Sequence, residues 1–245
     1  MSVALVTGGG GGIGRAIALR LAAGGADVAV VDLDESLGAE TARLVEAAGR
    51  RALFLRADVS RSADVEAFVE ATEERLGPID AFANNAGIEG VIAPIFDYPE
   101  DVFDRLLAVN AKGVFLGLKH VLARMCKRGT GAVVNTASTS AVRGRPGLAG
   151  YVATKHAVLG LTRVAALDVA GTAIRVNAVL PGPVETRMIR ALDAQAEQSG
   201  GIKRAGSARY GRPEDVANVV AFLLSAEAAH VNGAAWTVDA GATVP

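Results

Sequence analysis

The chain has 245 residues, 51% of them hydrophobic, and its 25 basic and 26 acidic residues give a formal net charge of −1. This length suits one large α/β domain, and the balanced charge gives no electrostatic case for binding nucleic acid or an anionic membrane. No apolar run reaches the roughly 18 residues of a membrane span, the N-terminal segment lacks the pattern of a signal peptide, and the single cysteine, Cys126, excludes an internal disulfide and a cysteine metal cluster. We therefore expect a cytoplasmic protein without a bound metal ion.

Short β-branched runs alternate along the chain with longer segments whose apolar residues recur at helical spacing. The first strand is predicted over Val3–Thr7 and the first helix over Ile13–Ala23. Further strands are expected over Asp27–Asp32, Arg51–Ala57, Asp80–Ala83, Ala132–Thr136, Arg175–Leu180 and Ala235–Val238. Further helices are expected over Leu37–Ala48, Ala63–Leu76, two stretches within Glu100–Lys127, Tyr151–Val169 and Glu214–Ser225. This alternation indicates right-handed βαβ units around a central parallel sheet. The irregular stretch Glu185–Gly211 is interpreted as a helical flap over a pocket.

A glycine run, Gly8–Gly12, joins the first predicted strand to the first predicted helix. It fits TGxxxGxG starting at Thr7 and equally GxGxxG starting at Gly9, and both patterns end at Gly14, so the register stays open. Glycine permits a sharp turn and a close approach of the backbone to a ligand. The helix N-terminus offers free N–H groups to phosphates. The run therefore predicts a site for a dinucleotide pyrophosphate.

Acidic residues follow the second and third predicted strands. Asp32 is placed to accept hydrogen bonds from the adenosine ribose and would repel a 2′-phosphate, and no basic residue follows it directly, which favours NAD over NADP. The alternative is that Asp32 caps the next helix. Asp58 could bind the adenine amino group or act as an N-cap. The segment 84–87 (Asn-Asn-Ala-Gly) ends the fourth strand, where small residues would let a cofactor lie against the backbone or would simply form a turn.

Tyr151 and Lys155 are four residues apart on a predicted helix and therefore share a face. Tyrosine ordinarily loses its proton near pH ~10, and a neighbouring ammonium lowers that pKa toward the range of acid/base catalysis. Ser138 ends a predicted strand, where its hydroxyl could hold a substrate carbonyl oxygen. The three groups suit carbonyl reduction, although a solvated helical pair is the alternative for Tyr151 and Lys155 taken alone.

In this order, the glycine run, Asp32, the segment 84–87, Ser138, Tyr151 and Lys155 resemble the short-chain dehydrogenase/reductase family. The resemblance continues through VNAVLPGPVET near residue 180 and GRPEDVA near residue 211. It implies a single Rossmann-type domain and a homotetramer. It also implies that Tyr151 is the general acid/base, that Lys155 lowers its pKa and binds the nicotinamide ribose, that Ser138 orients the substrate oxygen, and that Asn110 supports a proton relay.

The residues expected to bind the cofactor combine the patterns above with this resemblance. They are Gly8, Gly12, Ile13, Gly14, Asp32, Asp58, Val59, Asn85, Ala86, Gly87, Tyr151, Lys155, Pro181, Gly182, Val184 and Thr186. The candidates for a mostly apolar substrate pocket are Ser140, Val142, Leu148, Met188 and Ile189. Arg143 and Arg145 could clamp an anionic substrate, but a surface or interface role is the preferred interpretation. His156 is expected to be a packed helix residue.

The predicted function is NAD-dependent interconversion of a secondary alcohol and a ketone. The segment 85–122 looks similar to alcohol, cyclic-ketone and sugar dehydrogenases of the family. One alternative is a 3-oxoacyl thioester reductase, but such members usually prefer NADPH, and Asp32 argues against that cofactor. A more remote alternative is a cofactor-binding protein without catalysis, which should have lost Tyr151, Lys155 or Ser138.

Overall fold

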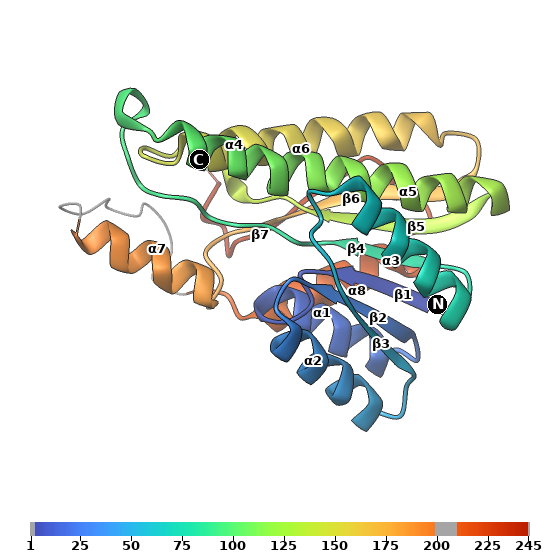
Figure 1. Ribbon diagram of the computed structural model, residues 1–245. Helices are drawn as coiled ribbons and strands as arrows, with labels where there is room; N and C mark the ends of the chain where they lie inside the picture. The colour runs from blue at the N-terminus through green and yellow to red at the C-terminus, as the bar shows by residue number, and fades with distance from the viewer. Residues whose placement is uncertain (1–2, 199–209, 245) are drawn as a thin grey trace.

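Seven strands form one sheet through the centre of the protein, and every neighbouring pair is parallel (Figure 1). The computed structural model describes residues 3–198 and 210–244. The strand order across the sheet is β3-β2-β1-β4-β5-β6-β7. In chain order the strands are β1 (Val3–Thr7), β2 (Asp27–Asp32), β3 (Ala52–Arg56), β4 (Ala81–Asn84), β5 (Thr130–Thr136), β6 (Ala173–Pro181) and β7 (Ala235–Val238).

Helices cover both faces of this sheet (Figure 1). One face carries α1 (Gly12–Ala23), α2 (Glu35–Ala47) and α8 (Pro213–Leu224), and the other carries α3 (Ser62–Arg75), α5 (Gly113–Arg128) and α6 (Ala149–Asp168). Two further helices, α4 (Glu100–Leu106) and α7 (Arg187–Gln198), and the short helical turns η1 (Ile95–Asp97), η2 (Leu107–Lys112), η3 (Thr139–Ala141) and η4 (Ala226–Ala228) lie between these elements. The predicted doubly wound α/β fold with a central parallel sheet is confirmed.

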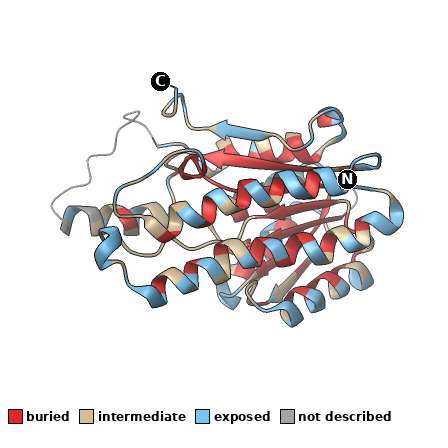
Figure 2. Cartoon of the chain, turned by 90° about the horizontal axis from the view of Figure 1, so that it is seen from above, coloured by how far each residue is buried: buried red, intermediate tan, exposed pale blue. Residues whose placement is uncertain are grey.

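The strand side chains alternate between two hydrophobic cores. Leu5 and Phe82 belong to the core under α3, α5 and α6, whereas Val6 and Val30 belong to the core under α1 and α8. Buried residues accordingly fill the inner strands and the inward sides of the helices (Figure 2). Because both faces are covered, the inner strands are apolar along most of their length, which accounts for much of the hydrophobic composition.

The connections leave β1 and β4 in opposite directions, because β2 and β3 lie on one side of this pair and β5, β6 and β7 lie on the other. A crevice opens at the carboxyl ends of two such strands, and ligands of open α/β sheets bind there. The glycine run follows β1 and the segment 84–87 includes the end of β4, so the fold places both of these predicted motifs at the same crevice.

The helix pattern within Glu100–Lys127 differs from the expected two stretches, because α4, the π-helical turn η2 and α5 follow one another without a break. By length and composition this run, Glu100–Arg128, is the one helix in residues 3–198 and 210–244 that could cross a membrane. In the fold it lies within the helix layer, and 44% of its most apolar window is buried against its neighbours. It therefore packs on this face of the sheet as one side of the helix layer.

The predicted flap over Glu185–Gly211 contains α7, which projects from the body of the protein (Figure 1). Its base is closed by a bridge between Val184 and Gly211, where the Glu185 amide donates to the Gly211 carbonyl at 2.8 Å. On α7, Gln195 accepts a hydrogen bond from the Ile92 amide at 3.3 Å. The flap helix is thus joined to the loop that follows β4. Residues 199–209 of the predicted flap lie outside the described residues.

Candidate active site

The glycine turn between β1 and α1 closes in the register TGxxxGxG. Gly8 and Gly12 have positive φ angles of 64° and 51°, which side-chain-bearing residues rarely adopt. A Cβ on Gly14 would lie 2.0 Å from the Gly8 carbonyl oxygen, so no side chain fits there. Gly11, which the alternative register requires, has an extended backbone and open space around it. The structure therefore settles the register that the sequence left open.

The start of α1 is available to a phosphate group. No side chain caps this helix, so the first-turn amides, including that of Ile13, are not occupied by a cap. A groove of about 560 Å³ separates the glycine turn from the start of α7 and is lined by Gly12, Thr186 and Arg187, among others. A Cβ on Gly12 would lie 3.1 Å from Thr186 Cγ2, which shows how closely the two elements face each other.

Hydrogen bonds between the ends of β1 and β4 hold this turn in place. The Thr7 hydroxyl accepts from the amides of Asn85 at 2.9 Å and Ala86 at 3.1 Å. The Asn85 side chain donates to the Thr7 carbonyl at 3.1 Å, and its oxygen accepts from the Thr136 hydroxyl at 3.1 Å. The Asn85 side chain therefore supports the turn, and we expect any cofactor contact in this segment at the backbone of Ala86 and Gly87.

Asp32 stands at the carboxyl end of β2, beside the glycine turn. One carboxylate oxygen accepts from the Gly10 amide at 2.7 Å and the other accepts from the Asp34 amide at 3.0 Å. Asp34, not Asp32, caps α2, because its side chain accepts from the Leu37 amide at 3.1 Å. The alternative interpretation of Asp32 as a helix cap is therefore wrong, and its carboxylate lies where an adenosine ribose would be recognised.

Asp58 does not cap α3 either. Its carboxylate accepts from the amide and hydroxyl of Ser60 at 2.9 and 2.7 Å, which closes a turn after β3, and its own amide donates to Asp64. The neighbouring Val59 packs against α5, since a Cβ on Gly113 would lie 3.0 Å from Val59 Cγ2. Contacts of Asp58 and Val59 with the adenine remain a prediction.

Lys155 is buried beneath Tyr151 on α6. Its ammonium donates to the Thr136 carbonyl at 2.9 Å and lies 5.6 Å from the centre of the Tyr151 ring. Burial lowers the pKa of Lys155 from 10.5 to about 8. The helical spacing therefore places the pair on one face as predicted, with the ammonium beside the ring and the carbonyl at the end of β5.

Burial also dominates at Tyr151 and raises the pKa of its phenol above 10.0, and the nearby Glu89 carboxylate raises this pKa further. A hydrogen bond with the Ser138 side chain and the positive charge of Arg145 act in the opposite direction. Removal of the phenol from water is thus the largest influence on this pKa, and the expectation that Lys155 lowers it remains a prediction.

Ser138 is held at the start of η3, where its hydroxyl accepts from the Ser140 amide at 3.1 Å. Its hydrogen bond with Tyr151 brings together two of the three side chains that the sequence nominated for catalysis. Both Ser138 and Ser140 are buried. A substrate oxygen at this point would meet one hydroxyl from the loop after β5 and one from α6.

Asn110, on the π-helical turn η2, clamps the loop after β4. Its carboxamide accepts from the Ile88 amide and donates to the Ile88 carbonyl, both at 2.8 Å, and it also donates to the Thr154 hydroxyl at 3.3 Å. Its side chain is fully buried. A π-helical turn at such a position is common near functional sites. The structure thus shows Asn110 as a positioning residue, and the proton relay implied by the family resemblance remains a prediction.

The remaining predicted site residues differ in their surroundings. Val184 is buried in the core under α1 and α8, so a cofactor contact there would use its backbone. Pro181 ends β6, and the amide of Gly182 donates to the Val238 carbonyl at 2.9 Å. Among the substrate candidates, Ser140 is buried, Val142 is 53% exposed, and Leu148, Met188 and Ile189 are half-buried.

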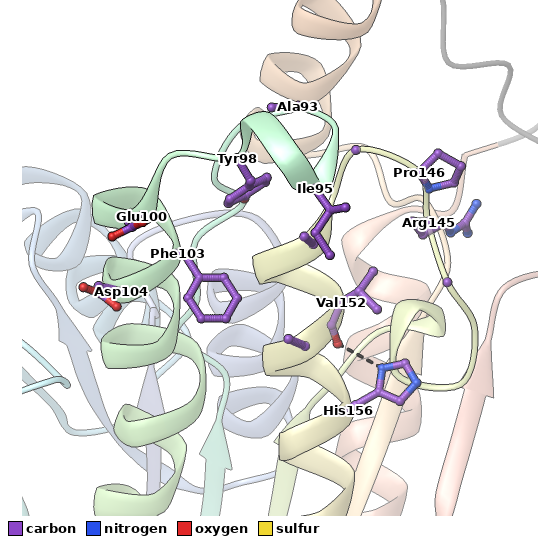
Figure 3. Close-up of a pocket in the computed structure, with 14 residues that line it drawn as sticks. Ala93, Ile95, Tyr98, Glu100, Phe103, Asp104, Arg145, Pro146, Val152 and His156 are labelled. Carbon is purple, nitrogen blue, oxygen red and sulfur yellow. Dashed lines mark hydrogen bonds between the residues drawn. The ribbon is translucent and has the colours of Figure 1, made fainter.

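Arg143, Arg145 and His156 lie around the site, on the loop after η3 and on α6. Arg143 ties the loop after η3 to the C-terminal segment by donating to the Ala242 carbonyl at 2.9 Å. Arg145 lies close enough to Tyr151 to affect its pKa. His156 is exposed, and its Nδ1 is 2.9 Å from the Val152 carbonyl oxygen, so the prediction of a packed histidine is wrong (Figure 3). It occupies the outward side of α6, away from Lys155.

Sequence reasoning missed three residues that shape the site. Thr136 and Thr154 make the hydrogen bonds described above, and Glu89 acts on Tyr151 through its charge. The position of Glu89, two residues beyond Gly87 at the carboxyl end of a central strand, was the signal that could have identified it. Among the described residues, no group of three or more His, Cys, Asp or Glu side chains could hold a metal ion.

Comparisons with known proteins agree with this geometry. A family profile described as Enoyl-(Acyl carrier protein) reductase matches residues 9–243. Levodione reductase of Leifsonia aquatica is 45% identical over 248 residues, which cover 98% of this chain and 93% of that protein. The crystal structure of levodione reductase matches with a TM-score of 0.93 and 42% identity, covering 100% of this chain and 98% of that one. The structure of NAD+-bound xylitol dehydrogenase matches with a TM-score of 0.91 and 35% identity over 98% of each chain.

The residues of this chain fit a bound NAD. The glycine turn leaves no room for a side chain at Gly14, α1 begins without a cap, and Asp32 provides a carboxylate at the end of β2. The chain is an NAD-dependent oxidoreductase that interconverts a secondary alcohol and a ketone. By its matched residues, its identity to these enzymes and its fold, it belongs to the short-chain dehydrogenase/reductase family.

Proposed function

We propose that the substrate of this enzyme is a small cyclic ketone, a sugar or a similar compound, with Tyr151 as the general acid/base. The observation that carries the proposal is the convergence of half-buried Tyr151 with buried Ser138 and Lys155 at the carboxyl end of β5. The similarity to levodione reductase and xylitol dehydrogenase supports this substrate range.

The side chains divide the chemistry among them. NAD, when bound, accepts the hydride in alcohol oxidation and supplies it in ketone reduction. The Tyr151 phenol donates a proton to the substrate oxygen in reduction and takes it back in oxidation. The Ser138 hydroxyl holds the same oxygen, and buried Lys155, fixed by the Thr136 carbonyl, provides positive charge and a donor beneath the phenol.

Reduction of a 3-oxoacyl thioester is the second candidate function, and the similarity to a 3-ketoacyl-(acyl-carrier-protein) reductase, with a TM-score of 0.90 and 35% identity, favours it. Asp32 opposes the NADPH-dependent form of this reaction, because its carboxylate would repel the 2′-phosphate of NADPH. We would follow NADH oxidation with cyclic ketones, diketones, keto-sugars and one acetoacetyl thioester, with NADPH in parallel. Turnover of a ketone with NADH supports the first function, and preference for the thioester with NADPH overturns it.

Replacement of Tyr151 by phenylalanine tests the acid/base assignment. Tyr151→Phe removes only the hydroxyl, so we expect kcat to fall by about a hundredfold to ten-thousandfold while NADH binding, measured by fluorescence titration, changes little. The matched control is Tyr98→Phe, which removes a phenolic hydroxyl that lines the groove between α4 and α6. Substantial residual activity in Tyr151→Phe would contradict the assigned role.

Asp32→Ser tests the basis of cofactor choice. Loss of the carboxylate should weaken NAD binding and relax discrimination against NADP by about tenfold to a hundredfold, the usual consequence of losing hydrogen bonds to a charged group. Asp34→Ser is the control, because it removes a carboxylate two residues away and leaves a side chain able to cap α2. An NAD/NADP preference that is the same in Asp32→Ser and wild type would disprove the ribose contact.

The raised pKa of Tyr151 predicts different pH dependences for the two reaction directions. The phenol keeps its proton at neutral pH, so ketone reduction should be nearly constant between about pH 6 and 8. Alcohol oxidation requires the phenolate, and its kcat/KM should therefore rise by about tenfold per pH unit in the same range. Steady-state profiles in both directions test this. An oxidation rate that falls as the pH rises is incompatible with Tyr151 as the base.

We also propose that the enzyme is a cytoplasmic homotetramer. Cys126 is an exposed free thiol, which suits a reducing compartment.

The outward side of α5 and α6 exposes Phe115, Val164 and Leu167 at 47%, 56% and 75% of their surface. It continues into a groove of about 940 Å³ between α4 and α6, lined by Phe103 and others (Figure 3). An exposed apolar face of this kind is typical of a subunit interface.

A second apolar surface lies at the sheet edge, where β7 exposes Trp236 beside Phe222 of α8. Two separate self-complementary surfaces generate a tetramer with twofold axes.

We expect Leu167→Glu to convert the tetramer into a dimer in light scattering, because it places a charge on the face of α6. Leu44→Glu, on α2, is the control. A monomeric wild-type protein, or an unchanged mass for Leu167→Glu, contradicts this assembly.

A further inference from the structure

The side chain of Arg15, near the start of α1, reaches back to the glycine turn. Its Nη2 group donates to the Gly10 carbonyl at 2.8 Å, and the Gly10 amide donates to the Asp32 carboxylate at 2.7 Å. A Cβ on Gly10 would lie 2.8 Å from Asp32 Oδ2, so the carboxylate packs directly against the turn. The carboxylate expected to bind the adenosine ribose and the Arg15 guanidinium are thus linked through a single residue of the turn.

Arg15 is fixed in turn by α2. Its Nε group donates to the Thr41 hydroxyl at 3.0 Å, and its Nη2 group also donates to the Glu40 carboxylate at 2.6 Å and to the Leu37 carbonyl at 3.3 Å. Thr41 is fully buried, and its hydroxyl donates to the Leu37 carbonyl at 3.1 Å. A planar guanidinium with several donors suits a junction of this kind. Arg15 therefore joins the glycine turn to the helix that follows Asp32.

Gly10 lies in a segment that has no side chains to fix its conformation. Residues 8–12 are all glycine, and glycine loses more conformational freedom on folding than any other residue. Hydrogen bonds to the backbone therefore define this turn. The Gly9 amide donates to the Val31 carbonyl at 3.1 Å on one side, and the Arg15 guanidinium holds the Gly10 carbonyl on the other. In such a segment, the direction of a backbone N–H group depends on the hydrogen bonds made on either side of it.

We propose that Arg15 is a positioning residue for cofactor selectivity. By holding the Gly10 carbonyl against α2, it keeps the Gly10 amide directed at Asp32 and thereby fixes the carboxylate oxygens that accept the ribose hydroxyls. Arg15 touches neither the cofactor nor the substrate in this role. The inference rests on the ribose contact proposed for Asp32 and goes beyond it, because it assigns the orientation of that carboxylate to a residue of α1.

Electrostatics alone predicts the opposite effect of Arg15 on selectivity. A positive charge beside the adenosine site would attract a 2′-phosphate, so loss of that charge would strengthen discrimination against NADP. Loss of a positioning residue weakens this discrimination, because Asp32 then accepts the ribose hydroxyls less well. The charge of Arg15 is paired with Glu40, and Arg56, the register partner of Asp32 on β3, is a further cation at this end of the sheet. The sign of the change in selectivity therefore distinguishes positioning from charge.

The test measures the dissociation constants of NADH and NADPH by fluorescence titration for wild type, Arg15→Met and Arg15→Met/Glu40→Gln. In both variants the ratio of the NADPH constant to the NADH constant should fall by about tenfold, the effect of losing one hydrogen bond to a charged group. The KM for NADH should rise by about tenfold, while kcat at saturating NADH stays within about twofold of wild type. The control is Arg20→Met, which removes the same charge farther along α1, where the side chain donates to Asn218, and should keep the wild-type ratio.

A double-mutant cycle with Asp32 shows whether Arg15 acts through that carboxylate. In the Asp32→Ser background, addition of Arg15→Met should change the ratio of the two dissociation constants by less than about twofold, because the same carboxylate carries both effects. A wild-type ratio in Asp32→Ser disproves the ribose contact and this inference with it. A lowered ratio in Asp32→Ser, together with an unchanged or raised ratio in the Arg15 variants or with fully additive effects, overturns the role of Arg15 alone.

Thermal unfolding checks that each variant is folded. Arg15→Met leaves the Glu40 carboxylate without its partner, whereas Arg15→Met/Glu40→Gln removes both charges of the pair and keeps the net charge of wild type. The charge-neutral variant therefore decides the outcome where the two variants differ, or where Arg15→Met does not fold.

Discussion

The hydrogen bonds between the ends of β1 and β4 are the constraint on which the site depends. The Thr7 hydroxyl and the Asn85 side chain join two adjacent strands whose connections leave in opposite directions. This junction sets the glycine turn beside the loop that carries Gly87 to the catalytic lysine. The cofactor-binding turn and the proton-transfer groups, which are more than 120 residues apart in sequence, thereby share one crevice.

Burial and charge act against each other at Tyr151, and burial is the larger effect. Removal from water raises the pKa of the phenol, while Ser138 and Arg145 partly offset that effect and Glu89 reinforces it. The phenol is consequently a ready proton donor at neutral pH and a base only when the pH rises. Lys155 responds to the same environment, because burial lowers its pKa to about 8. The cleft thus combines a phenol whose pKa has moved away from neutrality with an ammonium group whose pKa has moved toward it.

The loop that follows β4 is held in place by contacts with residues that do not react with the substrate. Asn110 holds Ile88 from the π-helical turn, and the lack of space at Gly90 fixes the other side of Glu89. The flap helix α7 is joined to the same loop through Gln195, and its base is closed by the bridge at Val184.

Much of the fold and the catalytic core followed from sequence, because local patterns carry them. Periodicity predicted the alternating strands and helices, with β1, β2 and β7 at their observed bounds, and the spacing of Tyr151 and Lys155 placed them on one helix face. The acidic end of β2 likewise predicted the cofactor. The helix boundaries around η2 did not follow from the sequence, since a π-helical turn interrupts the spacing of apolar residues without ending the helix.

What only the tertiary structure decided depends on contacts between distant segments. The glycine register required the approach of Gly14 to the Gly8 carbonyl, and the cap of α2 required the geometry of Asp34. The direction of the Tyr151 pKa shift required knowing how deeply the phenol is buried, and the nearness of Glu89 required the packing of the loop after β4 against α6. The sequence by itself determined which elements form and which residues carry the chemistry, because these follow from local spacing. The tertiary structure alone decided the electrostatic environment of those residues, because burial and charge are set by neighbours that the chain order does not reveal.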